Sequence, residues 1–131
     1  MSVLERIGEE QRVRLETSDP PAWSPPMLAT LTHDYFSDPD WIFERKFDGE
    51  RALAICRYGN VRLMTRNRKV ISDTYPEVVD ALRGAVGKDC VLDGEVVAFD
   101  GSVTSFSRLQ KRMQIKDRDV ARKSGVAVCL Y

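Results

Sequence analysis

Glu44-Arg45-Lys46-Phe47-Asp48-Gly49-Glu50-Arg51 is the stretch of the 131-residue chain that indicates most about its fold and chemistry. Read as a strand, residues 41–48 alternate between two faces, with Trp41, Phe43, Arg45 and Phe47 on one and Ile42, Glu44, Lys46 and Asp48 on the other. Gly49 then permits a bend that brings Arg51 back towards Lys46. A lysine amine attacks only in its neutral form, which burial and nearby cations favour. The stretch therefore predicts a strand that presents a nucleophilic lysine to a phosphate.

The composition fits one globular domain. Hydrophobic residues make up 43% of the chain and charged residues 31%, and no apolar run is long enough to cross a bilayer. The N-terminus lacks the apolar core of a signal peptide. Cys56, Cys90 and Cys129 lie far apart beside apolar runs, which predicts reduced core thiols, and the single histidine argues against a zinc site. We expect a cytoplasmic protein without membrane contact.

Charges are segregated along the chain, although Lys plus Arg and Asp plus Glu both number 20. Residues 45–69 carry eight basic and two acidic side chains, and residues 108–131 carry seven basic and two acidic. The first basic segment contains Lys46, so a polyphosphate and a nucleic-acid backbone are its expected partners. Arg66, Arg68 and Lys69 follow a predicted hairpin, where side chains converge. We therefore predict that they contact DNA; solvated surface charge is the alternative.

Turn residues divide the chain into short elements, and the proline-rich end of residues 1–25 marks these as a leader and linker. We expect a polar helix within 5–16, followed by strands at 51–58 and 61–65 joined by Gly59-Asn60. The next helix has Thr74 and Glu77 as a capping box, and its apolar stripe consists of Val78, Val79, Leu82 and Val86. Strands at 90–92 and 95–99 follow, interrupted by Asp93-Gly94. A helix then starts at Ser105, with Phe106, Leu109 and Met113 on one face and Arg108, Lys111 and Arg112 off it, and a buried strand is expected at 126–131. This order predicts an α+β fold with largely antiparallel sheets and flanking helices.

Two further candidate groups come from the strands. Asp93 and Glu95 share a strand face at a spacing of two, which suits a hard divalent cation or ribose hydroxyls; an Asp-Gly bulge beside a solvated glutamate is the alternative. Arg66 at the end of the hairpin has the planar guanidinium that binds a phosphate or ribose, or it is a surface arginine.

Taken in order, these segments resemble ATP-dependent DNA ligases across nearly all of residues 26–131. The matching segments are Pro26-Met27-Leu28-Ala29, the Lys-x-Asp-Gly-x-Arg signature at residues 46–51, Thr65-Arg66-Asn67 with Tyr75-Pro76-Glu77, Leu92-Asp93-Gly94-Glu95, and Ser105-Phe106-Ser107-Arg108-Leu109-Gln110-Lys111-Arg112. The set is closest to bacterial ligases of the end-joining and repair type. Arg68 departs from the family pattern, because it stands where the family usually has glycine. The turn is therefore expected to place its positive φ on Asn67 or to use another geometry.

The resemblance implies three transfers, in which Lys46 takes AMP from ATP, AMP passes to a DNA 5′-phosphate, and the 3′-hydroxyl displaces AMP. It implies Lys46 and Asp48 as catalytic residues, Glu44, Arg45, Arg51, Arg66 and Glu95 as nucleotide contacts, and Asp93 and Glu95 as ligands of Mg²⁺ or Mn²⁺. Arg66, Arg68 and Lys69 are the expected contacts to nicked or broken double-stranded DNA, in repair and recombination alongside other repair proteins.

Family motifs expected after the last strand, and an OB-fold domain, are not in the sequence, so residues 26–131 are expected to be a truncated adenylation domain that does not seal DNA alone. Three alternatives stay open. RNA ligases and capping enzymes share residues 46–51, although residues 105–112 favour a DNA ligase. An NAD-dependent ligase also uses such a lysine in a different flanking sequence. A non-catalytic remnant would bind nucleotide or DNA without turnover.

Overall fold

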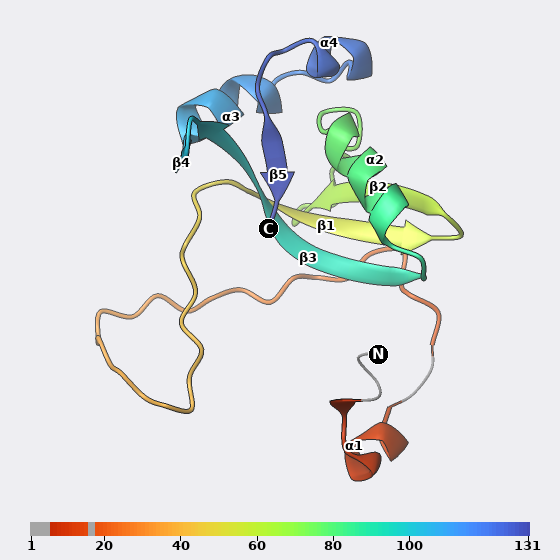
Figure 1. Cartoon of the computed structure of the whole chain (residues 1–131), viewed down its shortest axis with the longest axis vertical. Helices are drawn as coiled ribbons and strands as arrows, with labels where there is room; N and C mark the ends of the chain where they lie inside the picture. Colours follow the sequence, from red (N-terminus) through yellow and green to blue (C-terminus); the bar gives the residue numbers. More distant parts are fainter. Residues whose placement is uncertain (1–5, 16–17) are drawn as a thin grey trace.

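An antiparallel sheet with helices packed on one face forms the body of the molecule in the computed structural model, which describes residues 6–15 and 18–131 (Figure 1). The elements are α1 (Glu9–Val13), β1 (Glu50–Arg57), β2 (Asn60–Thr65), α2 (Pro76–Ala85), β3 (Cys90–Asp100), β4 (Val103–Thr104), α3 (Phe106–Met113), α4 (Arg118–Arg122) and β5 (Val128–Leu130). The α+β prediction is therefore confirmed. Within the described residues, no helix is both long and apolar enough to cross a membrane.

The long strand β3 organises the sheet, whose order is β2-β1-β3-β4 with β5 also paired to β3. The first part of β3 pairs with β1, from Cys56 opposite Cys90 to Glu50 opposite Val96, and the next part pairs with β5. The predicted interruption at Asp93-Gly94 is wrong, because β3 runs through it. A Cβ on Gly94 would lie 2.3 Å from the carbonyl oxygen of Tyr131. Glycine is needed there because the backbones of Gly94 and Tyr131 approach closely, and the strand makes no turn at this position.

The β1–β2 hairpin forms as expected, with its turn displaced by one residue. Tyr58 and Gly59 both have positive φ, 49° and 73°, as a two-residue type I′ turn requires. Asn60 pairs with Arg57 and belongs to β2. Asparagine in the sequence signalled a turn, and it borders that turn instead of forming it.

The strand predicted over residues 41–48 is wrong. No described strand pairs with this segment, and without a ladder partner an extended segment does not become part of a sheet. Trp41 is 61% exposed and Phe43 is 62% exposed, so the predicted apolar face does not pack on the core. Phe47 alone of that face is half-buried.

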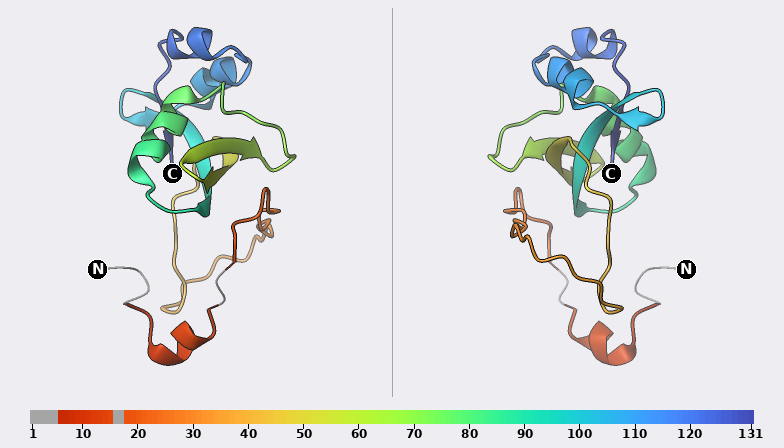
Figure 2. Two further views of the ribbon diagram at one scale, coloured as in Figure 1. Left: turned by 90° about the vertical axis from the view of Figure 1, so that its right-hand side faces the viewer. Right: turned by 90° about the vertical axis from the view of Figure 1, so that its left-hand side faces the viewer.

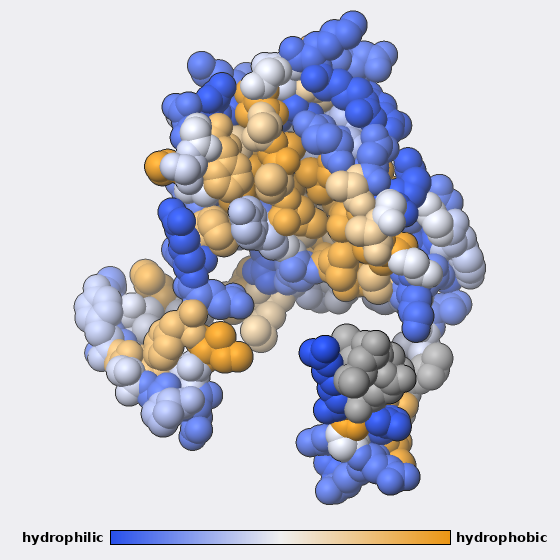
Figure 3. Space-filling model, viewed as in Figure 1, coloured by the Kyte–Doolittle hydropathy of each residue, from blue (hydrophilic) through white to orange (hydrophobic). Residues whose placement is uncertain are grey.

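The core lies between the sheet and α2 and α3. Ala52, Ala54 and Leu63 are buried from the sheet, Val78 and Val79 from α2, and Leu109 from α3. The apolar stripe predicted for α2 is confirmed, with Leu82 and Val86 packed at its edge. In the view of Figure 3, apolar side chains gather over the region where β5 and α2 lie in Figure 1. Helix α1 lies apart from the sheet in every view (Figure 2).

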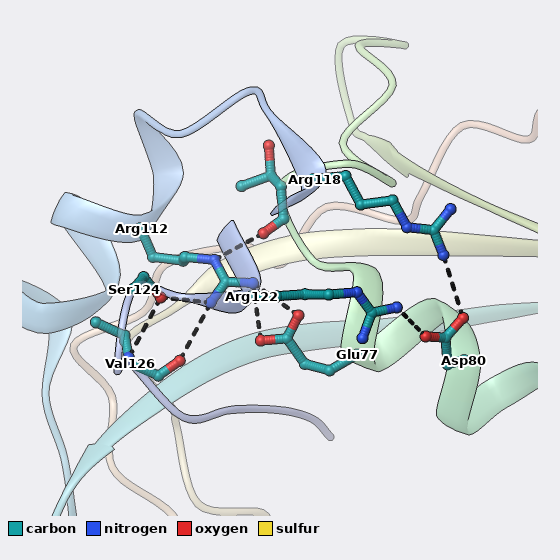
Figure 4. Close-up of polar contacts among 8 residues, drawn as sticks. Glu77, Asp80, Arg112, Arg118, Arg122, Ser124 and Val126 are labelled. Atoms are coloured by element: carbon teal, nitrogen blue, oxygen red, sulfur yellow. Dashed lines mark hydrogen bonds and ion pairs between the residues drawn. The ribbon is translucent and has the colours of Figure 1, made fainter. Parts of the chain in front are cut away.

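The buried Arg112 links α3 to α2 and to the chain before β5 (Figure 4). Its side chain is 1% exposed and donates two hydrogen bonds to Glu77, at 2.8 and 2.7 Å, and others to Thr74 O, Ser124 Oγ and Val126 O. The sequence placed Arg112 off the buried face and Glu77 in a capping box, and both predictions are wrong. The N-cap of α2 is Tyr75, which makes no side-chain cap, and the carboxylate of Glu77 is engaged by Arg112.

The three cysteines are free thiols, as expected. Cys56 is buried and Cys90 is half-buried, while Cys129 is exposed and so is not a core residue. Cys129 lies on the face of β5 that points away from the helices, between the inward-facing Val128 and Leu130.

Candidate active site

A cleft of about 880 Å³ lies on the sheet face opposite α2 and α3. Alternation along β1 sends Ala52 and Ala54 towards the helices, and Arg51 therefore to the other face with Leu53. Residues 44–47 return over this face and close one side of the cleft. The lining residues are Ala29, Glu44, Arg45, Lys46, Phe47, Arg51, Asp93, Gly94, Glu95 and Tyr131.

Gly49 fixes the Lys46 segment against β3. Its amide donates a hydrogen bond to Glu95 Oε1 at 3.0 Å. A Cβ on Gly49 would lie 2.3 Å from the Val96 carbonyl oxygen and 2.8 Å from Glu95 Cγ, so no larger residue fits. The chain bends at Gly49, as the sequence predicted, and the close approach to β3 is a second requirement for glycine that the sequence did not show. Because the position of Gly49 is fixed, Lys46, which lies three residues before it, is held at the rim of the cleft.

Arg51 and Asp93 form an ion pair on the floor of the cleft. Arg51 donates from Nε to Asp93 Oδ1 at 2.9 Å and from NH2 to Oδ2 at 2.6 Å, and its NH1 donates to the Met27 carbonyl at 2.6 Å. The hydrogen bonds from Arg51 lower the pKa of Asp93, and the same bonds raise the pKa of Arg51. Both groups are therefore charged across the physiological range, and one edge of the guanidinium is aligned by a fixed carboxylate.

Aromatic rings form another wall, which the sequence did not predict. The rings of Phe47 and Tyr131 stack with centroids 4.5 Å apart and an interplanar angle of 26°, and the Arg45 guanidinium lies 5.6 Å from the Phe47 centroid. Tyr131 is held by backbone bonds with Glu95 in both directions, at 2.7 and 3.0 Å. Two aromatic residues 84 positions apart cannot be matched from spacing. Their alternation with apolar neighbours was the only available signal, and it indicated core packing.

A second cleft of about 420 Å³ adjoins the first, because Arg51 and Glu95 line both. Arg66, Asn67 and Lys69 line the second cleft as well. Their loop is closed by Thr65, whose amide donates to the Lys69 carbonyl at 2.9 Å and whose Oγ1 accepts from the amides of Asn67 and Lys69. Two of the three predicted DNA contacts, Arg66 and Lys69, thus lie beside the Lys46 cleft.

Arg68, the third, points elsewhere. Its guanidinium lies 4.1 Å from the ring centroid of Trp23, and Arg68 lines neither cleft. Of the two expected alternatives, the structure has the second: Arg68 itself adopts the positive φ, 63°, and Asn67 does not. A left-handed conformation costs a non-glycine residue roughly 1 to 2 kcal/mol, and a cation–π contact contributes about 0.5 to 2 kcal/mol. The stack with Trp23 is therefore of the size needed to offset the backbone strain.

The Glu50 carboxylate at the edge of the second cleft is anchored in the core. Tyr75, which is fully buried, donates its hydroxyl to Glu50 Oε2 at 2.6 Å. Burial and this hydrogen bond raise the pKa of Tyr75 well above its ordinary value. The tyrosine is therefore neutral at all physiological pH values and holds the start of β1, where the residues of both clefts meet.

Asp93 and Glu95, the predicted metal pair, line the same cleft, and both accept hydrogen bonds from other residues of the site. Both Asp93 oxygens accept hydrogen bonds from Arg51, and one Glu95 oxygen accepts from Gly49. In the part of the chain that the structure describes, no cluster of three or more His, Cys, Asp or Glu side chains is arranged to hold a metal ion. Asp48 is exposed and lines neither cleft. The remaining predicted residues, Glu44, Arg45, Lys46, Arg51 and Glu95, lie together around one cleft.

A model of the ATP dependent DNA ligase domain matches residues 26–131. The chain belongs to the ATP-dependent DNA ligase family. It is 39% identical over 88 residues to a probable DNA ligase of Koribacter versatilis, and 39% over 89 residues to the multifunctional non-homologous end joining protein LigD of Mycobacterium bovis. These matches cover 66% of this ligase-family chain but only 15% and 12% of those proteins.

A solved structure agrees with this family. A mycobacterial DNA ligase D complexed with ATP and MES superposes with a TM-score of 0.53 at 30% identity, covering 67% of this chain and 26% of that one. The predicted resemblance to DNA ligases is therefore confirmed, as is a fold of the adenylation-domain type.

Proposed function

We propose that the larger cleft binds ATP and that Lys46 accepts AMP from it, as the first step of DNA end sealing. The observation that carries this proposal is the position of Lys46 in one cleft with two arginines, three carboxylates and a pair of stacked aromatic rings. Arginines suit phosphates, a carboxylate suits ribose hydroxyls, and aromatic rings suit a purine.

In the proposed step, the neutral amine of Lys46 attacks the α-phosphorus of ATP. A nitrogen–phosphorus bond forms, the bond from that phosphorus to the oxygen of the β-phosphate breaks, and pyrophosphate leaves with its electron pair. The amine loses a proton to solvent or a nearby carboxylate. Such a transfer depends on positioning and on neutralising the phosphate charge. Arg45 and Arg51 supply positive charge at the cleft, and Glu44 and Glu95 lie where they can accept hydrogen bonds from the nucleotide.

Mg²⁺, or Mn²⁺ in its place, would be held by Glu95 together with the phosphates of ATP. Magnesium commonly binds through one or two carboxylates plus substrate phosphates and retains several waters, so the absence of a three-ligand cluster among residues 6–15 and 18–131 does not conflict with it. The ion would neutralise charge on the phosphates. Asp93 is a poor ligand here, because both of its oxygens are engaged by Arg51.

We propose that DNA reaches this site through the second cleft. Arg66 and Lys69 line it, and it joins the first cleft at Arg51 and Glu95, so a DNA 5′-phosphate bound there would lie beside the AMP carrier. The substrate would be nicked or broken duplex DNA. A relative is named as an end-joining protein, which supports a role in repair and recombination. We further propose that the protein acts in the cytoplasm and with other repair proteins as partners. Residues 26–131 would supply part of an adenylation domain.

Mass spectrometry after incubation with ATP and magnesium tests the proposal. A covalent gain of one AMP, retained on unfolding the protein and lost on transfer to a nicked duplex, is the expected result. Incubation with NAD⁺ in place of ATP is the control and should give no adduct. Reversible nucleotide binding without any adduct would contradict the catalytic proposal and support the non-catalytic remnant.

A further inference from the structure

Residues 19–29 run along the sheet face that carries the cleft (Figure 1). Asp19 accepts a hydrogen bond from Arg57 at the far end of β1, at 3.1 Å. Trp23 packs on Leu53, Ile55 and Met64 in the middle. Met27 accepts from Arg51 at the cleft. The contacts advance along β1 in reverse order of sequence, so the segment lies antiparallel to that strand and reaches the cleft at Ala29. We refer to residues 19–29 as the strap.

Trp23 is the anchor of the strap. Its ring packs on Leu53, Ile55 and Met64 and also makes a cation–π contact with the Arg68 guanidinium. The indole Nε1 is buried with no hydrogen-bond partner among the described residues. Packing and the cation–π contact therefore hold the ring, and not a hydrogen bond. Residues 19–25 precede the segment that matches the family model, residues 26–131, so this anchor lies outside the matched domain.

The strap meets the cleft at Arg51. Asp93 orients one edge of the guanidinium through Nε and NH2, and the Met27 carbonyl orients NH1 at 2.6 Å. The Met27 side chain is 86% exposed and contributes little packing of its own. The position of its carbonyl is therefore fixed by neighbouring anchors, of which Trp23 is the nearest described one on the sheet.

We propose that the strap is a positioning element of the nucleotide cleft, with Trp23, clamped by Arg68, as the residue that holds the Met27 carbonyl on Arg51. The inference rests on the proposed function, since Arg51 is assigned to ATP there. The strained φ of Arg68 has a role in this account: the left-handed backbone directs the guanidinium onto Trp23 while Arg66 and Lys69 face the second cleft. One short loop thus supports both the strap and the DNA side of the site.

Docking of the strap can be read from fluorescence, because the chain has two tryptophans, Trp23 and Trp41. In a Trp41→Phe protein the emission of Trp23 should be that of a shielded indole, poorly quenched by acrylamide. Adding Arg68→Gly should shift the emission to the red and increase quenching. Replacing the exposed Arg118 of α4, which packs on α2 and not on the strap, by Ala is the control and should change neither. Emission of a fully solvated indole in the Trp41→Phe protein would overturn the docked strap.

The positioning role is tested by a double-mutant cycle on ATP affinity, measured by calorimetry with magnesium. Trp23→Ala should weaken ATP binding about tenfold, the order expected for losing one oriented hydrogen bond to a charged group, and Trp23→Phe should restore most of it. In an Arg51→Ala background, Trp23→Ala should have almost no further effect, because the group on which it acts is gone. An equal loss in both backgrounds, or no loss in either, would overturn the proposal.

Two further results distinguish a failure of the positioning role from a failure of the proposed ATP binding. If Trp23→Ala does not fold, Asp19→Asn and Arg68→Ala enter the same cycle, and the same additivity criterion decides. If the unaltered chain binds no ATP, the proposed function and the positioning role both fail, while the Trp23 emission still decides whether the strap is docked.

Discussion

Arg51 and Asp93, on adjacent strands, are joined by two parallel hydrogen bonds of 2.9 and 2.6 Å. They lie on the same face of the sheet but are not directly opposite each other, because Arg51 pairs with Glu95 and Leu53 pairs with Asp93. The guanidinium therefore reaches diagonally across the two strands to its partner. The pair orients a cation on the floor of the cleft, and the Met27 carbonyl accepts a further hydrogen bond from NH1 of the same guanidinium.

Asp93→Asn should change how stability depends on pH. The pKa of Asp93 is lower in the folded state than the ordinary aspartate value of about 3.9. Its carboxylate therefore stabilises the folded protein above about pH 4, and this contribution is lost as the pH falls through the lowered pKa. Urea unfolding at a series of acidic pH values should show a shallower loss of stability for Asp93→Asn than for the unaltered chain. The exposed Asp73→Asn is the control, and identical profiles for all three proteins would contradict the assignment.

Gly94→Ala should destabilise the β3–β5 pairing. The added Cβ would lie 2.3 Å from the Tyr131 carbonyl oxygen, and that carbonyl accepts the Glu95 amide at 2.7 Å. We expect a loss of about 1 to 3 kcal/mol in the free energy of unfolding, as for overpacking elsewhere. Gly84→Ala, in α2 with open space around its Cβ position, is the matched control and should stabilise by up to about 1 kcal/mol. Equal effects of the two substitutions would show that the close approach at Gly94 is not tight.

Arg112→Ala should cost about 3 kcal/mol or more, because it leaves the carboxylate of Glu77 and several buried acceptors without their donor. Arg108→Ala removes an exposed pair with Asp100 and should cost less than about 1 kcal/mol. Chemical denaturation measures both. A small effect of Arg112→Ala would mean that the junction of α2, α3 and β5 is held by apolar packing alone.

Arg66→Ala should weaken DNA binding and reduce its salt dependence. One lost phosphate contact lowers the slope of log affinity against log salt by about one. Arg62→Ala removes an exposed arginine of β2 that lines neither the ATP cleft nor the second cleft, and it should leave the slope unchanged. Titration of a nicked duplex at several salt concentrations gives both slopes, and an unaltered slope for Arg66→Ala would make it a surface charge.

Local patterns in the sequence predicted most elements of the fold, because hairpin spacing, helical apolar periodicity and breaker residues act over a few positions. They failed where a distant residue decided the outcome. Glu77 read as a capping residue until Arg112, 35 positions later, engaged it. Asp93-Gly94 read as a break because the close approach of Tyr131 that requires the glycine is invisible in sequence. Residues 41–48 alternated like a strand, but alternation says nothing about whether a ladder partner lies alongside.

For the candidate site too, local patterns in the sequence were informative and contacts between distant residues were not visible. The Lys46 signature predicted which residue types belong together, and the structure gathers Glu44, Arg45, Lys46, Arg51 and Glu95 around one cleft. Spacing could not show that Asp93 is committed to Arg51, nor that Arg68 turns away to Trp23. The sequence did not reveal the strap, because proline-rich segments usually serve as linkers and because its contacts are with β1 residues 24 to 38 positions onward.

The most direct test of Lys46 as the nucleophile is to locate the AMP adduct on the chain. After incubation with ATP and magnesium, peptide mapping by mass spectrometry should place one AMP on Lys46, and Lys46→Ala should carry none. Lys69→Ala, which alters a lysine of the neighbouring cleft, should be labelled like the unaltered chain. An adduct on another residue, or undiminished labelling of Lys46→Ala, would contradict the assignment of Lys46 as the nucleophile.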